Sequence, residues 1–278
     1  MEARLPLGQD GDPVRSVAVT PASLVFLAIH LGALGTLLAT FQSRLAWMAL
    51  LLYGVRMFGV TAGYHRYFSH RAYRLGRTAQ WLMACLAQSS GQKGALWWAA
   101  HHRDHHRHAD GPGDVHSPVQ DSFWWSHAGW VLSSRHDGTD LAKVADLARF
   151  PELRWLNRHH WVPALVTALL AAAWAGWPGL AWWCLSTVAL YHATFCINSL
   201  AHVWGTRRFA TPDRSRNNAL LALLTLGEGW HNNHHACPSA CSHRCRWWEL
   251  DLTQAGLQAL RILGIARNLR PRPLEARP

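Results

Sequence analysis

Two stretches of the chain carry histidines at a spacing that suits metal binding. The pattern HxxHH occurs in residues 102–106 and again in residues 231–235. Residues at positions i, i+3 and i+4 of a helix share one face, so each stretch is predicted to present three imidazoles as half of a metal site. The alternative explanation is a histidine-rich surface tract that binds metal only by accident. Such a tract has no reason to recur with the same spacing. The histidines concerned are His102, His105, His106, His231, His234 and His235.

Two further segments end in residues of the same chemical type. The apolar residues 45–63 run into a polar extension that carries His65 and His70, and a second apolar stretch ends with Asn198 and His202. Because Asn198 and His202 are four residues apart, they share a helical face. The Asn198 amide could therefore orient a water molecule on a metal ion.

The number and type of these side chains limit the metal. Nine imidazoles are too many for one zinc ion, which takes three or four ligands and often uses cysteine. The lack of carboxylates beside the histidines argues against calcium or magnesium, which prefer oxygen. Nine neutral nitrogen donors suit two metal ions with open positions, and such sites favour iron or copper and reactions with O₂.

The elements that must position these histidines are apolar helices. Half of the 278 residues are hydrophobic, yet the mean hydropathy is only −0.06, because polar and apolar residues form separate blocks. The apolar blocks predict four membrane spans, arranged as two hairpins, at about residues 23–41, 45–63, 161–175 and 180–200. The hairpin turns carry little charge, so the basic loops, the histidines and both termini are predicted to be cytoplasmic.

The expected fold class is therefore an all-α integral membrane protein with four transmembrane helices and a helical cytosolic cap. A flexible N-terminal arm covers residues 1–22, and the main domain covers residues 23–264. The cap is formed by residues 64–160 and 201–264, and an Arg/Pro-rich tail follows from 265 to 278.

The net charge and the spacing of the cysteines argue against other classes of protein. The net charge is +11, but no zinc-finger, RNP or basic-zipper pattern is present, so nucleic acid is not the expected partner. Lipid head groups or a phosphate-bearing substrate fit better. Cys237, Cys241 and Cys245 form a CxxxCxxxC pattern that matches no standard metal spacing. We therefore predict free thiols.

Taken together, the histidine motifs resemble those of a known enzyme family. His65-Arg-Tyr-Phe-Ser-His70, His102-Arg-Asp-His-His106 and His231-Asn-Asn-His-His235, with Asn198-Ser-Leu-Ala-His202 between them, look like the signature of the membrane acyl-CoA desaturases. The nearest match is the stearoyl-CoA Δ9-desaturase branch in its bacterial form. The NxxxH element separates this branch from the membrane alkane and sterol hydroxylases, which have three histidine boxes at different spacings.

The resemblance implies a non-haem di-iron centre under the cytosolic cap. At this centre O₂ would be reduced to water while a saturated long-chain acyl-CoA receives a cis double bond. Two electrons would come from a separate ferredoxin-, rubredoxin- or cytochrome b5-type donor, and the protein would lie in the bacterial inner membrane. The implied iron ligands are His65, His70, His102, His105, His106, His202, His231, His234 and His235, with Asn198 acting through a water molecule.

Several alternatives remain open on the sequence alone. Acyl chains carried by phospholipid or carrier protein could replace acyl-CoA, and a related di-iron hydroxylase could use the same ligands. A metal transporter should carry ligands near the bilayer midplane, where only His30 and His192 fall within the predicted spans. Three further histidines lie near residues 102–106, namely His101, His108 and His116. They are predicted to lie outside the ligand set.

The length of the acyl chain depends on where its tunnel closes. Ala49 lies roughly 24 Å before His65 along a continuous helix. We predict that this small side chain lies at the closed end, so that a larger residue there shortens the preferred chain.

Overall fold

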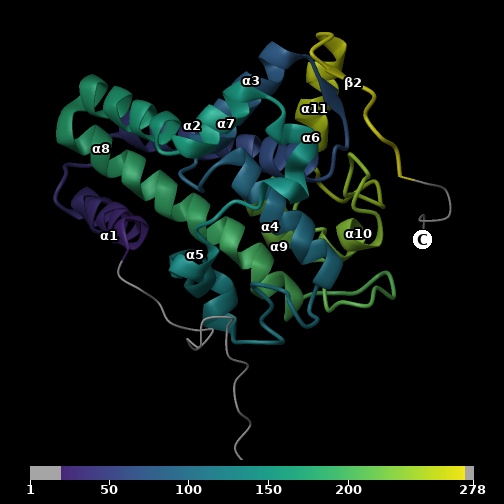
Figure 1. Cartoon of the computed structure of the whole chain (residues 1–278). Coiled ribbons are helices and arrows are strands. Elements are labelled where there is room, and N and C mark those ends of the chain that lie inside the picture. The colour runs from purple at the N-terminus through teal and green to yellow at the C-terminus, as the bar shows by residue number, and fades with distance from the viewer. Residues whose placement is uncertain (1–19, 273–278) are drawn as a thin grey trace, which may run out of the picture.

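The computed structural model describes residues 20–272, which form helices almost throughout (Figure 1). The longer helices are α1 (Pro21–Leu34), α2 (Ser43–Phe58), α3 (Arg77–Gln88), α4 (Ala95–His108), α7 (Pro151–Arg158), α8 (Val162–Asn198) and α11 (Leu252–Ile262). Shorter helical segments are η1 (Gly35–Leu37), η2 (Gly59–Ser69), η3 (Trp125–Gly129), α5 (Trp130–Leu132), η4 (Ser134–His136), η5 (Leu141–Val144), α6 (Ala145–Ala148), η6 (Leu200–His202), α9 (Ala219–Leu224) and α10 (His231–Ala236). Two short strands, β1 (Arg74–Leu75) and β2 (Ala266–Arg267), pair in antiparallel fashion.

The long helix α8 is a hairpin of two helical halves. Its backbone leaves the helical conformation at Ala175 and Gly176, and Gly176 has a φ of 62° that glycine adopts readily. The indole N–H of Trp183 donates a hydrogen bond to Thr167 Oγ1 at 3.0 Å. In a straight helix these two residues would be roughly 24 Å apart. The chain therefore reverses close to the predicted turn at residues 176–179.

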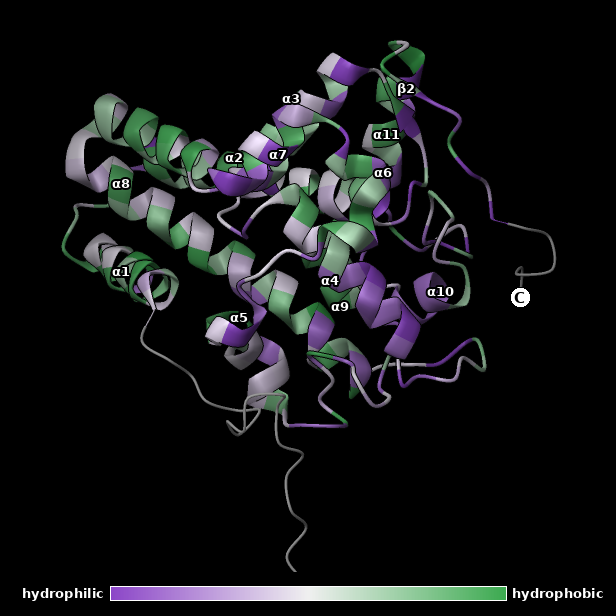
Figure 2. Ribbon diagram, in the orientation of Figure 1, coloured by the Kyte–Doolittle hydropathy of each residue, from purple (hydrophilic) through white to green (hydrophobic). Residues whose placement is uncertain are grey.

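Helices α1 and α2 both pack against α8, and their outer faces are apolar (Figure 2). Two helical stretches are long and apolar enough to cross a membrane, Ser43–Ser69 and Val162–His202, while Pro21–Leu37 is a shorter apolar helix. The first predicted span is thus shorter than expected. Large side chains stand exposed along these helices: Leu24, Leu27 and Leu31 on α1, Leu50 and Leu51 on α2, and Leu169 and Leu170 on α8. Such a surface suits contact with lipid.

A chain of three histidines that belong to none of the metal-type groups in residues 20–272 links α1, α8 and η3. His30 Nε2 on α1 lies 3.1 Å from His192 Nε2 on α8. The other ring nitrogen of His192 lies 2.9 Å from His127 Nε2 on η3. His30 is therefore a hydrogen-bonded residue of the helix interface.

The remaining elements form a second layer that holds α4 and α10, the helices of the two HxxHH boxes. Part of the predicted tail belongs to this layer, because the Arg270 N–H donates to Ala72 O at 2.8 Å and Arg270 O accepts from Cys241 N at 2.9 Å. Residues 1–19 of the predicted arm and 273–278 of the tail lie outside the described residues.

Candidate metal centre

The π-helix η2 brings the side chains of His65 and His70 together on one face. η2 continues α2 with wider turns, and the His70 N–H donates to His65 O, five residues earlier, at 3.2 Å. In an α-helix residues five apart point about 140° away from each other. The π-helical turn instead brings the two ring centroids to 4.8 Å. Gly59 allows η2 to pack closely on α3, because a Cβ there would lie 2.9 Å from Ala87 N.

Each HxxHH box divides its histidines between two clusters. On α4, His102 and His106 join the first cluster, whereas His105 joins the second. On α10, His231 and His235 join the second cluster, whereas His234 joins the first. The prediction that each box forms one half-site is therefore wrong, because each helix contributes to both clusters. The first cluster contains His65, His70, His102, His106 and His234, and the second contains His105, His202, His231 and His235.

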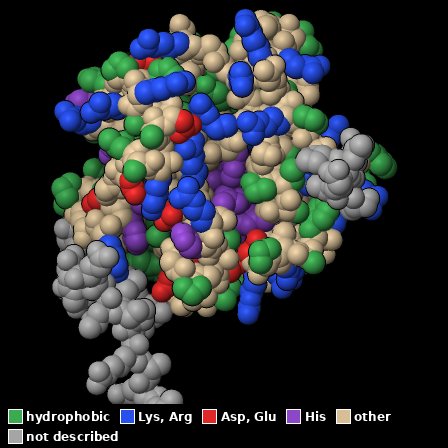
Figure 3. All heavy atoms as spheres, turned by 45° about the vertical axis from the view of Figure 1, so that its right-hand side comes forward, with side chains coloured by type: hydrophobic (Ala, Val, Ile, Leu, Met, Phe, Trp, Pro, Cys, Tyr) green, Lys and Arg blue, Asp and Glu red, His purple; other side chains and the backbone are tan. Residues whose placement is uncertain are grey.

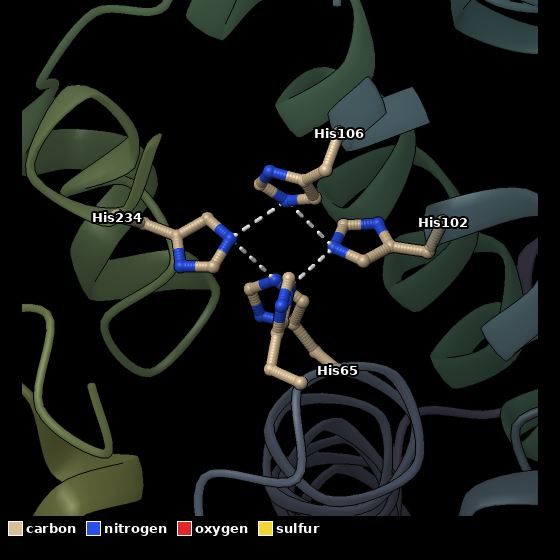
Figure 4. Close-up of side chains that lie close together, drawn as sticks. His65, His102, His106 and His234 are labelled. Atoms are coloured by element: carbon tan, nitrogen blue, oxygen red, sulfur yellow. Dashed lines mark hydrogen bonds between the residues drawn. The ribbon is translucent and has the colours of Figure 1, made fainter. Parts of the chain in front are cut away.

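Within the clusters, Nε2 atoms of neighbouring rings lie close together. Figure 4 shows four rings of the first cluster around a common centre. The Nε2–Nε2 distances are 3.0 Å for His65–His234, 3.0 Å for His234–His106, 3.1 Å for His106–His102, 2.8 Å for His102–His70 and, in the second cluster, 3.0 Å for His202–His231. Two nitrogens that each bind one ion at roughly 2.1 Å, at right angles, lie about 3.0 Å apart. The clusters thus fit two metal ions with nitrogen ligands.

Four carboxylates lie behind the histidines and contact their Nδ1 atoms. The pairs are His65–Glu228 at 2.5 Å, His105–Asp114 at 3.0 Å, His202–Asp110 at 2.7 Å and His235–Asp213 at 3.0 Å. A carboxylate at Nδ1 keeps the proton there and leaves the lone pair on Nε2 free for a metal. The argument that carboxylates are lacking beside the boxes is therefore wrong. Because these carboxylates contact Nδ1, the atoms that face the metal positions are still imidazole nitrogens in both clusters.

Comparison with known proteins agrees with this geometry. A family model described as fatty acid desaturase matches residues 42–262, which is most of the chain.

The chain belongs to the fatty acid desaturase family.

This desaturase is similar to enzymes that act on different acyl carriers. It is 34% identical to an sn-1 stearoyl-lipid 9-desaturase of Anabaena variabilis, over 89% of this chain and 92% of the relative. It is 36% identical to an sn-2 palmitoyl-lipid 9-desaturase of a Nostoc strain, over 76% of each chain. An acyl-CoA C20 Delta5-desaturase of Anemone leveillei is 32% identical, over 88% of this chain and 81% of the relative. The family predicted from the histidine motifs is thereby confirmed.

Burial keeps most of the desaturase's clustered histidines neutral. It lowers the pKa of His235 to about 4, although Asp213 acts in the opposite direction. Burial, reinforced by neighbouring imidazoles, also lowers the pKa well below the usual value for His70, His102, His106, His231 and His234. His105 differs, because Asp114 outweighs burial and raises its pKa. Neutral imidazoles are the form that binds metal.

One group near the first cluster was missed by the sequence reasoning. Glu228 Oε2 lies 3.1 Å from Nδ1 of His243, a fully buried residue between two of the cysteines, and it also contacts His65. The guanidinium of Arg66 lies 2.9 Å from Glu228 Oε1 and 2.9 Å from Asp251. A cation at this point does not favour a metal ion between His65 and His243. The signal in the sequence was Glu228 itself, three residues before the last box.

The other histidines near residues 102–106 are not members of the two clusters. His101 Nδ1 contacts Trp97 O at 3.0 Å, and His108 Nδ1 contacts Asp104 O at 3.1 Å on the surface. His116 is buried and its ring centroid lies 4.3 Å from that of His105. With Asp114 these two form a separate group of metal-type side chains.

The three clustered cysteines of the desaturase contribute to none of the metal-type groups in residues 20–272. None of the three forms a disulfide bond within the described residues. Burial raises the pKa of Cys241 to about 12, so its thiol stays neutral. A thiolate is the form that binds metal, and this environment disfavours it.

An apolar cavity of about 760 Å³ leads away from the clusters. His102 and Asn198 line it, and so do Trp183 and Ala168 deeper along α8. Asn198 therefore lies where the cavity approaches the histidines. Ala49 is not among the lining residues, and its carbonyl accepts a hydrogen bond from Ser186 at 2.8 Å. The prediction that Ala49 closes an acyl tunnel therefore gains no support from this cavity, whose deep wall is supplied by α8.

One face of the desaturase is hollowed toward solvent. Figure 3 shows histidine side chains at the bottom of a hollow, with lysine and arginine side chains on the surface around it. His70, His102 and His106 are partly exposed, whereas the side chain of His235 and the other five clustered histidines are buried. The clusters can thus be approached both from solvent and from the cavity.

Proposed function

We propose that this desaturase introduces a cis double bond, at Δ9, into saturated long-chain acyl groups. In the proposed reaction two adjacent methylenes lose two hydrogen atoms, and O₂ takes up these with two electrons and two protons to give two water molecules. The sequence motifs resemble those of acyl-CoA enzymes, whereas two of the similar proteins are named lipid 9-desaturases. Both acyl-CoA and acyl lipids are therefore candidate substrates.

The observation that carries the proposal is the contact between the apolar cavity and the paired histidine clusters. In this proposal the first cluster holds one iron ion and the second cluster holds the other, with Asn198 acting through a water molecule. Bound iron would supply the redox chemistry with O₂. The chain's own residues keep the Nε2 lone pairs free, through carboxylates such as Asp110, and hold the alkyl chain in an apolar space beside His102.

We further propose four membrane passes, with both termini and the cap in the cytoplasm of a bacterial cell. The exposed leucines of α1, α2 and α8 support contact with the hydrocarbon region. The turn at residues 176–179 carries no charge and joins the two halves of α8, more than 20 residues before His202. Electrons would come from a separate ferredoxin-, rubredoxin- or cytochrome b5-type protein.

Fatty-acid profiling of a host that expresses the chain tests the function. We expect new cis-monounsaturated acyl chains, and we expect His106→Ala and His235→Ala to abolish them and to lower the iron content of protein that still inserts. His108→Ala is the matched control, because His108 is exposed and outside both clusters. Full activity in His106→Ala or His235→Ala would remove that residue from the ligand set.

Labelled oxygen distinguishes desaturation from hydroxylation. With ¹⁸O₂, purified protein and a reconstituted electron donor, all of the label should appear in water and none in the acyl chain. Label retained as a hydroxyl group on the product would identify a hydroxylase instead.

A further inference from the structure

The apolar cavity reaches the outer surface between α1 and α8. Val25 on α1 and Leu165 on α8 both line the cavity, yet 58% and 45% of their surfaces are exposed. Residues that line an interior space and are also about half exposed lie where this space meets the outside. Deeper in the same region, Ala33 packs in one cluster with Ala164 and Ala168. The opening is therefore a slot that is closed at its deep end.

The surface around this slot is apolar. On α1, Leu24 and Leu31 have 56% and 59% of their surfaces exposed. On α8, the exposed fractions of Val166 and Leu169 are 48% and 58%. An exposed apolar patch of this kind on a helical hairpin faces hydrocarbon rather than water. The slot thus connects the cavity with the lipid phase.

The upper rim of the slot has polar groups but no free positive charge. Lys93 is the one lysine or arginine among the described lining residues, and it forms an ion pair with Asp137. His160 also lines the rim, and burial lowers its pKa, so it is neutral at pH 7. Coenzyme A carries several phosphate charges, whose recognition in proteins uses unpaired lysine and arginine. A neutral rim instead suits the ester and glycerol region of a membrane lipid.

We propose that the acyl chain enters this cavity sideways from the bilayer, through the slot between α1 and the first half of α8, while it is still esterified to a membrane glycerolipid. The ester then lies at the level of Thr20, Lys93 and Trp161, where the rim is polar and the indole suits the membrane interface. The methylenes pass beside His102 and Asn198, and the chain end lies toward Trp183. This inference rests on the proposed desaturase function and specifies its substrate.

Reconstitution separates lipid entry from acyl-CoA entry. Purified iron-loaded protein is placed in dioleoyl-phosphatidylcholine vesicles that contain some distearoyl-phosphatidylcholine, with ferredoxin, its reductase and NADPH. A parallel sample receives stearoyl-CoA in place of the distearoyl lipid, and intact products are identified by mass spectrometry. We expect a new double bond in the vesicle lipid and little or none in stearoyl-CoA. Desaturation of stearoyl-CoA with unchanged vesicle lipid overturns the inference but leaves the proposed function standing. No product from either substrate contradicts the proposed function, and the inference falls with it.

Variants of the slot test the route. Val25→Trp should reduce turnover of the vesicle lipid about tenfold or more, because the larger ring fills the slot. Leu31→Trp is the matched control on the same helix, since Leu31 is equally exposed and does not line the cavity. Leu165→Trp, with Leu169→Trp as its control, repeats the test from α8 in case one variant fails to insert. Full turnover in both slot variants overturns the inference.

Discussion

His202 Nδ1 lies 2.7 Å from Asp110 Oδ2, although 92 residues separate the two in the chain. Asp110 also accepts hydrogen bonds from Ser117 Oγ at 2.6 Å and from Arg214 N at 2.7 Å. These contacts outweigh the effect of burial and lower the pKa of Asp110 to about 2, so it stays charged. The carboxylate thus fixes the ring of His202 in the second cluster from behind.

Replacing Asp110 with asparagine should weaken metal binding without removing a ligand. The amide keeps the shape of the side chain but loses the charge that holds the proton on His202 Nδ1. Loss of such a partner lowers metal affinity by about 10- to 100-fold. Iron content measured at limiting iron should therefore fall. Asp140→Asn is the control, because Asp140 is exposed and contacts Ala142 and Lys143 of the adjacent segment η5. Equal iron content in both variants would show that Asp110 has no such role.

The buried ion pair of Arg66 should matter more for stability than an exposed pair. The side chain of Arg66 is fully buried between Glu228 and Asp251, whereas Arg77 pairs with Glu152 on the surface. Arg66→Met leaves two buried carboxylates without a cation, which costs about 3–5 kcal/mol. Arg77→Met should cost much less, because water screens an exposed ion pair. Thermal unfolding in detergent measures both, and similar losses in the two variants would contradict this prediction.

The sequence predicts the helices better than it predicts how the clusters are assembled. The apolar blocks and the turn at residues 176–179 follow from hydropathy and glycine. The assignment of His102 and His105 to different clusters cannot be predicted in this way, because residues i, i+3 and i+4 share a helical face whichever metal ion they bind. That division depends on where α10 packs against α4, which is a tertiary contact.

The supporting residues were also harder to find, for two reasons. The π-helix that aligns His65 with His70 depends on close packing of η2 against α3, and local propensity does not reveal it. Asp110 and Asp213 occur in loops far from their histidines in sequence, so their pairing is a property of the fold. Metal-bound histidines almost always have a partner for their second nitrogen, and that rule gives a reason to search such loops for carboxylates.

Trp183 should set the length of acyl chain that the cavity accepts. Its side chain is buried at the deep end, and its indole donates a hydrogen bond to Thr167. Trp183→Leu opens space beyond the chain end, and one methylene in an apolar pocket changes discrimination by about tenfold or more. The ratio of C20 to C18 products should therefore rise by about tenfold. Trp182→Leu is the neighbouring control, because Trp182 does not line the cavity. An unchanged product ratio in Trp183→Leu would mean that another residue closes the cavity.

The metal-free protein should lose stability as the pH falls from about 6.5 to about 4. Burial lowers the pKa of His235 and of His243 to about 4 in the folded state, whereas an unfolded histidine has a pKa of about 6.5. Between these values the unfolded chain binds more protons, so unfolding is favoured as the pH decreases. His105 has a raised pKa and acts in the opposite sense, but it is outnumbered by the histidines whose pKa is lowered.

The midpoint of thermal unfolding, measured on chelator-treated protein in detergent, checks this prediction. The midpoint should be nearly constant above pH 7 and should fall steadily between pH 6.5 and pH 4, before Asp110 begins to protonate near its pKa of about 2. Iron-loaded protein should release its metal over the same range, because protons compete for the same nitrogen atoms. A midpoint that stays constant from pH 7 to pH 4 would show that the clustered histidines are not held neutral by burial.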